Sequence, residues 1–175
     1  NPDDVKDTWW TQEHISLDAY SRYFIPKYIS EEKVLYLDAD LLVLKNLEDI
    51  FEIDMKGHPI AAVMDTDNQS FNSGVLLIDN GLWKRENMTE QLVNETNGSL
   101  QQALEGNIPK FNGDQTIFNK VFRDRWLALD KRMNLQVGHD VTAFMSHWPN
   151  HFKDSEDPYV VHFVSHRKPW ATLSA

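Results

Sequence analysis

The stretch that decides the fold is Lys33-Val-Leu-Tyr-Leu-Asp38-Ala-Asp40-Leu-Leu-Val-Leu44, the most apolar part of the chain. Short apolar runs that do not alternate with polar residues are typical of buried strands. The sequence therefore predicts a buried strand on each side of the two carboxylates. Similar runs predict further strands at Ile60–Met64, Val75–Ile78, Trp126–Leu129 and Tyr159–Val164.

Helical patterns separate these strands. Ser16 is a suitable N-cap for a helix over roughly residues 17–29, which Pro26 should kink or shorten. Asn46-Leu-Glu-Asp49 resembles the capped start of a short helix. Further helices are expected near Leu82–Val93, Leu100–Leu104 and Asp114–Phe122. Buried strands separated by helices predict an α/β fold with helices on both faces of the sheet, in a single domain over residues 1–175.

Composition excludes several classes of function. The 175 residues include no cysteine, so disulfide frameworks, cysteine-ligated zinc, iron–sulfur clusters and thiol catalysis are excluded. A formal charge of −10 argues against nucleic-acid partners and against anionic membranes. No apolar run is long enough to span a bilayer, and no signal peptide opens the chain. We therefore expect a cytoplasmic protein, with a membrane-proximal role only through segments outside this sequence.

Asp38 and Asp40 are the sharpest chemical feature. Two ionised carboxylates between apolar runs are costly unless a cation neutralises them or one holds a proton. A divalent metal meets this need and offers a site for phosphate oxygens. The alternative is that they are N-caps or turn residues at the end of a strand. A second pair, Asp65 and Asp67, runs into a polar loop and is expected to be solvated.

His162 lies in the apolar run Tyr159-Val-Val-His-Phe-Val164. Its plainer interpretation is a hydrogen-bonded core histidine. As a third ligand beside two aspartates, its imidazole would favour Mn²⁺ over Mg²⁺. Lys168 follows closely, in a His166-Arg167-Lys168 cluster that is either a diphosphate clamp or a solvated basic tail.

Two weaker signals are polar residues beside predicted elements. Phe71-Asn72-Ser73-Gly74 precedes the strand predicted from Val75, where a glycine allows a ligand to approach the backbone or simply makes a turn. Gly113-Asp114-Gln115 opens a predicted helix. Asp114 is therefore an ordinary N-cap, or Asp114 and Gln115 are partners for sugar hydroxyls.

Taken in order, these motifs resemble glycosyltransferase family 8. The resemblance rests on Tyr36-Leu-Asp-Ala-Asp-Leu-Leu-Val43, Phe71-Asn-Ser-Gly-Val-Leu-Leu-Ile-Asp79, Gly113-Asp-Gln-Thr-Ile-Phe-Asn119 and Val161-His-Phe…Lys168-Pro-Trp170. It implies a Rossmann-like nucleotide-sugar transferase fold of GT-A type, with a mixed sheet. It also implies retaining, metal-dependent transfer of a hexose, glucose or galactose, from a UDP-sugar to a glycan or protein acceptor.

The same resemblance implies roles for individual residues. Asp38, Asp40 and His162 would bind Mn²⁺, with Mg²⁺ as the alternative, and Lys168 would bind the diphosphate. Ser73 would contribute a backbone contact to the donor. The groups expected around the donor sugar are Arg22, Asp38, Asn72, Asp114 and Gln115, of which Asn72, Asp114 and Gln115 are the catalytic candidates.

The chain also departs from the family pattern. It begins after the strand–helix region that binds uracil and ribose, so that N-terminal part is expected to be missing. The segment between Asp65 and Phe71 is shorter than expected, the family's extension after the Lys-Pro-Trp motif is absent, and Ser165 stands where a glycine is frequent.

No strong nucleophile is obvious for the far face of the sugar. Same-face attack by the acceptor, with Gln115 stabilising an oxocarbenium-like state, is therefore the favoured mechanism. One rival is an aspartate-based phosphatase with Asp38 as nucleophile and Asp40 as acid/base, although such enzymes usually follow the second aspartate with Gly-Thr and not with Leu-Leu. Another rival is a non-catalytic sugar-binding or scaffolding domain of the same fold.

Overall fold

The computed structural model of the chain describes residues 4–10, 16–109, 113–137, 157–164, 168 and 170. The chain forms two compact units. The first comprises Asn1–Val34, Met55–Ile60 and Ile78–Leu127, and the second comprises Leu35–Asp54, Ala61–Leu77 and Ala128–Ala175.

The described residues form two sheets. The larger has the strand order β1-β4-β3-β5, and the smaller has the order β2-β7-β6. Because β7 pairs antiparallel with β2 and parallel with β6, the smaller sheet is mixed. The strands are β1 (Lys33–Leu37), β2 (Leu41–Val43), β3 (Ile60–Met64), β4 (Phe71–Asp79), β5 (Trp126–Ala128), β6 (Leu135–Val137) and β7 (Val160–Phe163).

The strand predictions hold best where the chain is most deeply buried. β3 has the predicted bounds, and all its residues except Met64 are buried. β4 is longer than predicted because it begins at Phe71, so the polar stretch before Val75 lies inside the strand. Asn72 and Ser73 are nonetheless buried. Polar groups are tolerated at such positions when hydrogen bonds satisfy them, and the Asn72 side chain accepts one from the Gly74 amide.

The prediction that the strands flanking the two aspartates are buried is wrong. Every residue of β1 is only partly buried, and Leu42 of β2 is about half exposed. Within the part of the chain that the structure describes, both strands lie at an edge of their sheet, with a paired strand on one side only. The apolar residues of a segment indicate that it favours burial, but they do not indicate whether its strand lies at the centre or at the edge of a sheet.

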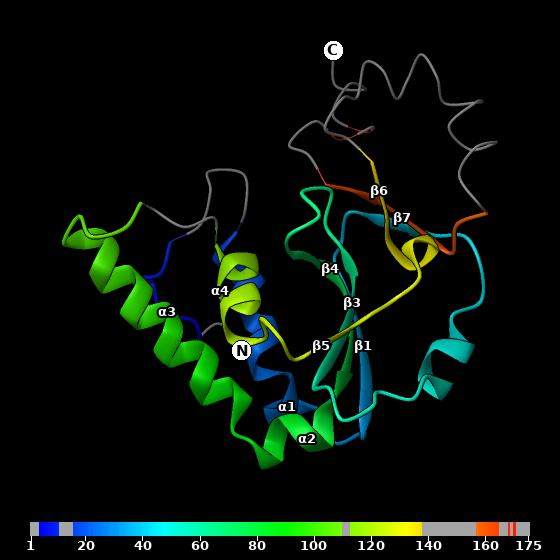
Figure 1. The fold of residues 1–175 in the computed structure, drawn as a ribbon, viewed down its shortest axis with the longest axis horizontal. Coiled ribbons are helices and arrows are strands. Elements are labelled where there is room, and N and C mark those ends of the chain that lie inside the picture. Colours follow the sequence, from blue (N-terminus) through cyan, green and yellow to red (C-terminus); the bar gives the residue numbers. More distant parts are fainter. Residues whose placement is uncertain are drawn as a thin grey trace. The chain divides into compact units, whose positions relative to one another are not determined.

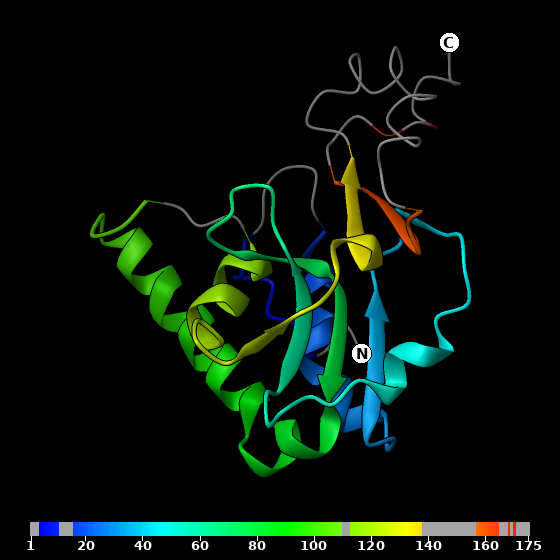
Figure 2. The same ribbon diagram turned by 45° about the vertical axis from the view of Figure 1, so that its right-hand side comes forward.

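The smaller sheet lies wholly in the second unit and holds His162 in its central strand. Leu41 of β2 and Gln136 of β6 are the cross-strand partners of His162. Figure 2 shows β6 in yellow beside β7 in orange. Val137, Val161 and Phe163 form a small hydrophobic cluster in this sheet. The short strand β6 and the 3-10 helix Lys131–Asn134 before it were not predicted.

The first unit contains the α-helices, which Figure 1 labels. Its core is an aromatic cluster in which the Tyr23 and Phe118 rings pack edge to face, with centroids 5.3 Å apart, and Trp83 packs against Phe122. α3 and α4 lie side by side in this unit. The helices are the 3-10 helix Leu17–Phe24, α1 (Ile25–Tyr28), α2 (Asn80–Arg85), α3 (Met88–Leu104) and α4 (Asp114–Val121).

Most helix starts agree with the sequence predictions, but the helices expected over residues 17–29 and Leu82–Val93 each divide into two. The separate helix predicted at Leu100–Leu104 is wrong, because these residues continue α3. The Ser16 hydroxyl accepts a hydrogen bond from the Asp18 amide, which confirms the N-cap. Pro26 lies in the first turn of α1, where its missing N–H has no helical partner to lose. α2 and α3 are separate because Asn87 adopts a left-handed conformation with φ 52°. Asn46 accepts from the Glu48 amide at the start of the 3-10 helix Glu48–Glu52.

Within the described ranges, every helix is too short or too polar to cross a lipid bilayer.

Gly98 offers a direct test of the packing of α3. A Cβ built at this position meets no atom within 4 Å, and glycine inside a helix costs about 1 kcal/mol relative to alanine. We expect Gly98→Ala to raise the free energy of unfolding by about 0.5–1 kcal/mol. Denaturant unfolding followed by circular dichroism measures this change. A lower midpoint with an unchanged slope would contradict the open surroundings of Gly98.

Candidate metal centre

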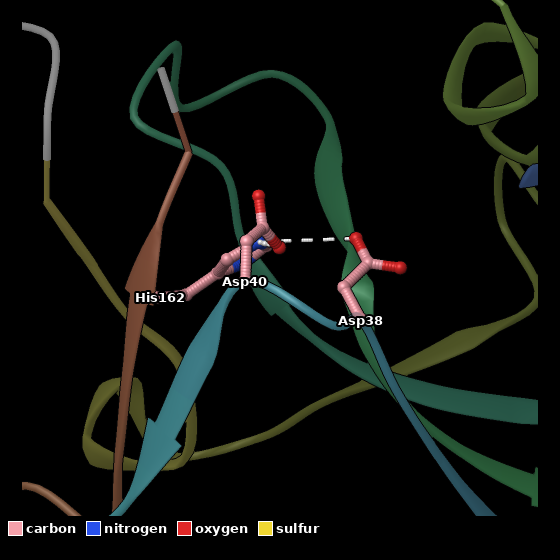
Figure 3. A group of neighbouring side chains, drawn as sticks. All are labelled: Asp38, Asp40 and His162. Atoms are coloured by element: carbon pink, nitrogen blue, oxygen red, sulfur yellow. Dashed lines mark hydrogen bonds and ion pairs between the residues drawn. The ribbon is translucent and has the colours of Figure 1, made fainter. Parts of the chain in front are cut away.

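Asp38, Asp40 and His162 meet in the second unit (Figure 3). One potential ligand atom from each residue lies within 4.8 Å of the other two. His162 Nε2 is 3.1 Å from Asp40 Oδ1 and 3.8 Å from Asp38 Oδ2. The three side chains predicted as metal ligands therefore form a single cluster.

Local backbone contacts bring these residues together. Asp38 follows β1, and its amide donates to the Gly74 carbonyl at 2.8 Å, which ties the end of β1 to β4. Asp40 directly precedes β2, and its carbonyl accepts from the Phe163 amide at 3.0 Å. Because β2 and β7 are paired in register, the ring of His162 is presented beside Asp40.

The cluster is less dry than the sequence suggested. The side chains of Asp38 and Asp40 are 25% and 28% exposed, whereas that of His162 is 4% exposed. Both aspartates lie in the connection between β1 and β2, which are edge strands of the described sheets. Because the two carboxylates are partly exposed while the imidazole is buried, one side of the cluster is accessible to a cation and to the further ligands that the cation would bind.

Electrostatics keep Asp40 ionised. Burial alone would raise the pKa of Asp40, but the interactions of its carboxylate with His162 and Lys168 outweigh burial and hold that pKa well below its ordinary value. Lys168 Nζ lies 2.5 Å from Asp40 Oδ2 and also donates to the Phe163 carbonyl. Lys168 therefore reaches the cluster. The other two members of the basic cluster, His166 and Arg167, and the preceding Ser165 lie outside the described residues.

The donor atoms fit a divalent cation. Two carboxylates and one imidazole are ligands that suit Mn²⁺, and Mg²⁺ accepts the same oxygens. The Tyr36 hydroxyl donates to Asp38 Oδ1 at 2.7 Å, so Oδ2 is the oxygen that faces His162. The sequence singles out Asp38 but not Tyr36. The spacing of Tyr36 and Asp38 could have indicated their contact, because residues two apart on a strand lie on the same face.

Gly74 makes room for this cluster. A Cβ built on Gly74 would overlap His162 Cε1 and lie 2.7 Å from His162 Nδ1 and 2.8 Å from Asp38 Oδ2. The sequence predicts that this glycine lets a ligand approach the backbone. In the structure, the side chains of the metal centre make that approach.

Asn72 lies close to Gly74 in β4 and is almost fully buried. Its Oδ1 accepts from the Gly74 amide and from Asn134 Nδ2, and its Nδ2 lies 3.5 Å from Asp65 Oδ2. Asn134, which sequence reasoning missed, also contacts His162 Nδ1 at 3.1 Å. The sequence around Asn134 offers only a weak signal, the alternation Leu135-Gln136-Val137 that follows it.

The second aspartate pair lies in a turn. Asp67 is exposed and accepts from the Gln69 and Ser70 amides, and these hydrogen bonds lower its pKa. This agrees with the expectation that the pair is solvated.

Arg22 and Asp114 form a buried ion pair in the first unit. Arg22 Nε lies 2.9 Å from Asp114 Oδ2, and each side chain is 5% exposed. Asp114 is the first residue of α4, and Gly113, with φ 78°, holds the N-cap position that the sequence suggested for Asp114. Burial and the Asp114 charge together raise the pKa of Tyr23 well above its ordinary value. Gln115 is half-buried beside Asp114.

Comparison with known proteins identifies the family. The model of Glycosyl transferase family 8 matches residues 5–174. The chain belongs to glycosyltransferase family 8. Two similar proteins from Streptococcus pneumoniae serotype 4 (strain ATCC BAA-334 / TIGR4) are the glycosyltransferases GlyD and GlyA. GlyD is 48% identical over 95% of this chain, and GlyA is 40% identical over 92% of it.

Solved structures agree with the GT-A-type α/β fold expected of family 8. The crystal structure of the glycosyltransferase GlyE from Streptococcus pneumoniae TIGR4 has a TM-score of 0.69 and 36% identity, covering 85% of this chain and 38% of GlyE. The galactosyltransferase LgtC, solved with donor and acceptor sugar analogs, has a TM-score of 0.71 and 26% identity, covering 97% of this chain and 66% of LgtC. This chain spans only 20% of GlyD and 22% of GlyA.

Proposed function

We propose that this family 8 chain transfers a hexose, glucose or galactose, from a UDP-sugar to a glycan or glycoprotein acceptor, with retention of configuration and with Mn²⁺ as cofactor. The observation that carries the proposal is the Asp38–Asp40–His162 cluster. The similar proteins GlyD, GlyA and GlyE are glycosyltransferases, and LgtC was solved with sugar analogs of both donor and acceptor.

The reaction breaks the bond between sugar C1 and the diphosphate oxygen, and the electron pair of that bond leaves with UDP. The acceptor hydroxyl bonds to C1 from the same face, and its proton leaves with the released diphosphate. A bound Mn²⁺ would neutralise charge on the departing diphosphate. Lys168 is the chain's own cation for the same task, because its ammonium group already lies against Asp40.

The donor-sugar roles are proposed residue by residue. In the second unit, Asn72 would hydrogen-bond the sugar, Ser73 would supply a backbone contact, and Asp38 would serve both metal and sugar. In the first unit, the Arg22–Asp114 ion pair would fix the Asp114 carboxylate for sugar hydroxyls. Gln115, which follows Asp114 at the start of α4, would stabilise the oxocarbenium-like state.

Calorimetric titration of UDP into the protein tests this function. We expect binding in the presence of Mn²⁺ and loss of that binding in EDTA, because the diphosphate would be held through the cation at the carboxylates. Equal binding in both solutions would contradict a metal-dependent site. Absence of binding in both solutions, also for a longer chain that carries the region expected to bind uracil and ribose, would contradict a UDP-sugar donor and favour a non-catalytic domain of the same fold.

A further inference from the structure

Asn134 joins the metal centre to β4 from within the second unit. It ends the 3-10 helix Lys131–Asn134, and it is 1% exposed. Its Nδ2 lies 2.8 Å from Asn72 Oδ1, and its Oδ1 lies 3.1 Å from His162 Nδ1. Both ends of this buried amide are therefore used.

The hydrogen bonds around Asn72 fix which end of the Asn134 amide faces His162. The Gly74 amide donates to Asn72 Oδ1 at 3.0 Å, so the atom at that position must be an oxygen. At its other end, Asn72 presents its amino group to Asp65, whose carboxylate can only accept. Because Asn72 offers an oxygen, Asn134 must turn its own amino group toward it. The carbonyl oxygen of Asn134 then faces the imidazole.

This orientation determines the tautomer of His162. An amide oxygen can only accept a hydrogen bond, so His162 Nδ1 must carry a proton. In a neutral imidazole, the lone pair then lies on Nε2. Nε2 is the nitrogen that faces Asp40 Oδ1 at 3.1 Å and Asp38 Oδ2 at 3.8 Å (Figure 3). Three acceptors converge there, an arrangement that a cation satisfies.

We propose that Asn134 is a positioning residue that holds His162 as the Nδ1–H tautomer, with Nε2 directed at the cation. The residue acts through His162 and does not itself touch the metal or the donor. Partners of this kind fix the ring orientation of histidine ligands, and their loss typically weakens metal binding by about 10- to 100-fold. The inference rests on the proposed metal site, but the tautomer itself is defined without metal.

Two substitutions separate positioning from mere structural support. Asn134→Leu keeps the branched shape of the side chain but removes the acceptor for Nδ1–H. Asn134→Asp keeps that acceptor but places a carboxylate against Asn72 Oδ1, so it should destabilise the fold while leaving the tautomer intact. Asn46→Leu is the matched control, because the Asn46 side chain is exposed and its hydrogen bonds among the described residues stay within its own turn, with Glu48.

The first measurement is the tautomer in the metal-free protein, by ¹⁵N–¹H correlation spectroscopy of the imidazoles at about pH 9, above the ordinary imidazole pKa. The second is Mn²⁺ binding, from the electron paramagnetic resonance signal of the free ion. We expect Nδ1–H in the wild type, in Asn134→Asp and in Asn46→Leu, and its loss in Asn134→Leu. Mn²⁺ affinity should fall about 10- to 100-fold in Asn134→Leu and less than about threefold in Asn134→Asp and the control.

The outcomes distinguish the two proposals. Nε2–H in the wild type, or wild-type Mn²⁺ affinity in Asn134→Leu, would overturn the positioning role. An equal loss of affinity in Asn134→Leu and Asn134→Asp, in step with their stabilities, would overturn it as well and leave only a structural role. If the wild type binds no Mn²⁺, the metal-dependent function fails, and the cation-directing part of the inference fails with it, whatever the tautomer.

Discussion

Replacing Asp38 by asparagine is expected to weaken Mn²⁺ binding, and with it Mn²⁺-dependent UDP binding, by at least about 100-fold. The expected loss exceeds the effect typical of outer partners because a ligand itself is removed. Asp38 Oδ2 is the oxygen that faces His162, and Tyr36 holds the other oxygen. An amide at this position has no charge, whichever of its ends faces the cation. Electron paramagnetic resonance of free Mn²⁺ and calorimetry of UDP measure the two affinities.

Asp67→Asn is the control for this substitution, because it changes the same residue type in the second aspartate pair. The amide oxygen of asparagine can still accept from the Gln69 and Ser70 amides, so the turn should persist. In the metal-free state, Asp38→Asn should be at least as stable as the wild type, because it removes one of two neighbouring negative charges. Unchanged Mn²⁺ affinity in Asp38→Asn would sink the assignment of the cluster. A loss accompanied by unfolding would not support it.

The proposed metal ligands could be singled out in the sequence, and the structure brings them together, because their chemistry is carried by residue type and by flanking pattern. Two carboxylates between apolar runs need a cation, and His162 in an apolar strand needs polar partners. One prediction from the same pattern is wrong, namely that both flanking strands are buried. Leu42 and Val43 are exposed on a strand that lies at an edge of the described sheet. The position of a strand in a sheet depends on pairing between distant segments, which the local pattern does not contain.

The supporting residues of the site could not be predicted because their roles depend on long-range register. Asn134 is near His162 only because β6 and β7 pair in parallel, with Leu135 opposite Val161. Nothing in the local sequence around Asn134 announces that pairing. The same is true of the Arg22–Asp114 ion pair, whose members are far apart in the chain and meet through the packing of the first unit. Arg22 was singled out by the family resemblance and Asp114 also by its place at the start of a predicted helix, but their contact with each other was not predicted.

The role of Gly74 could also not be predicted from the sequence, because it depends on the absence of a side chain at a position where other side chains pack. The sequence suggested space for a ligand at Gly74, whereas His162 and Asp38 fill that space. We expect Gly74→Ala to lower the free energy of unfolding by about 1–3 kcal/mol, the usual cost of overpacking a filled site. It should also weaken Mn²⁺ binding by at least about 100-fold, because the new methyl group displaces two of the three ligands at once, where loss of a single outer partner costs about 10- to 100-fold.

The physical reason is that neither ligand can move without losing a partner. The His162 ring is buried and contacts Asn134 through Nδ1 and Asp40 through Nε2, so a shift of the ring breaks at least one of these contacts. Asp38 is held by Tyr36 and by its backbone bond to Gly74. Thermal unfolding and Mn²⁺ binding, measured on Gly74→Ala and on the open-space control Gly98→Ala, test the prediction. Gly98→Ala should gain stability and keep its Mn²⁺ affinity. Full Mn²⁺ affinity in Gly74→Ala would show that the cluster does not pack against Gly74.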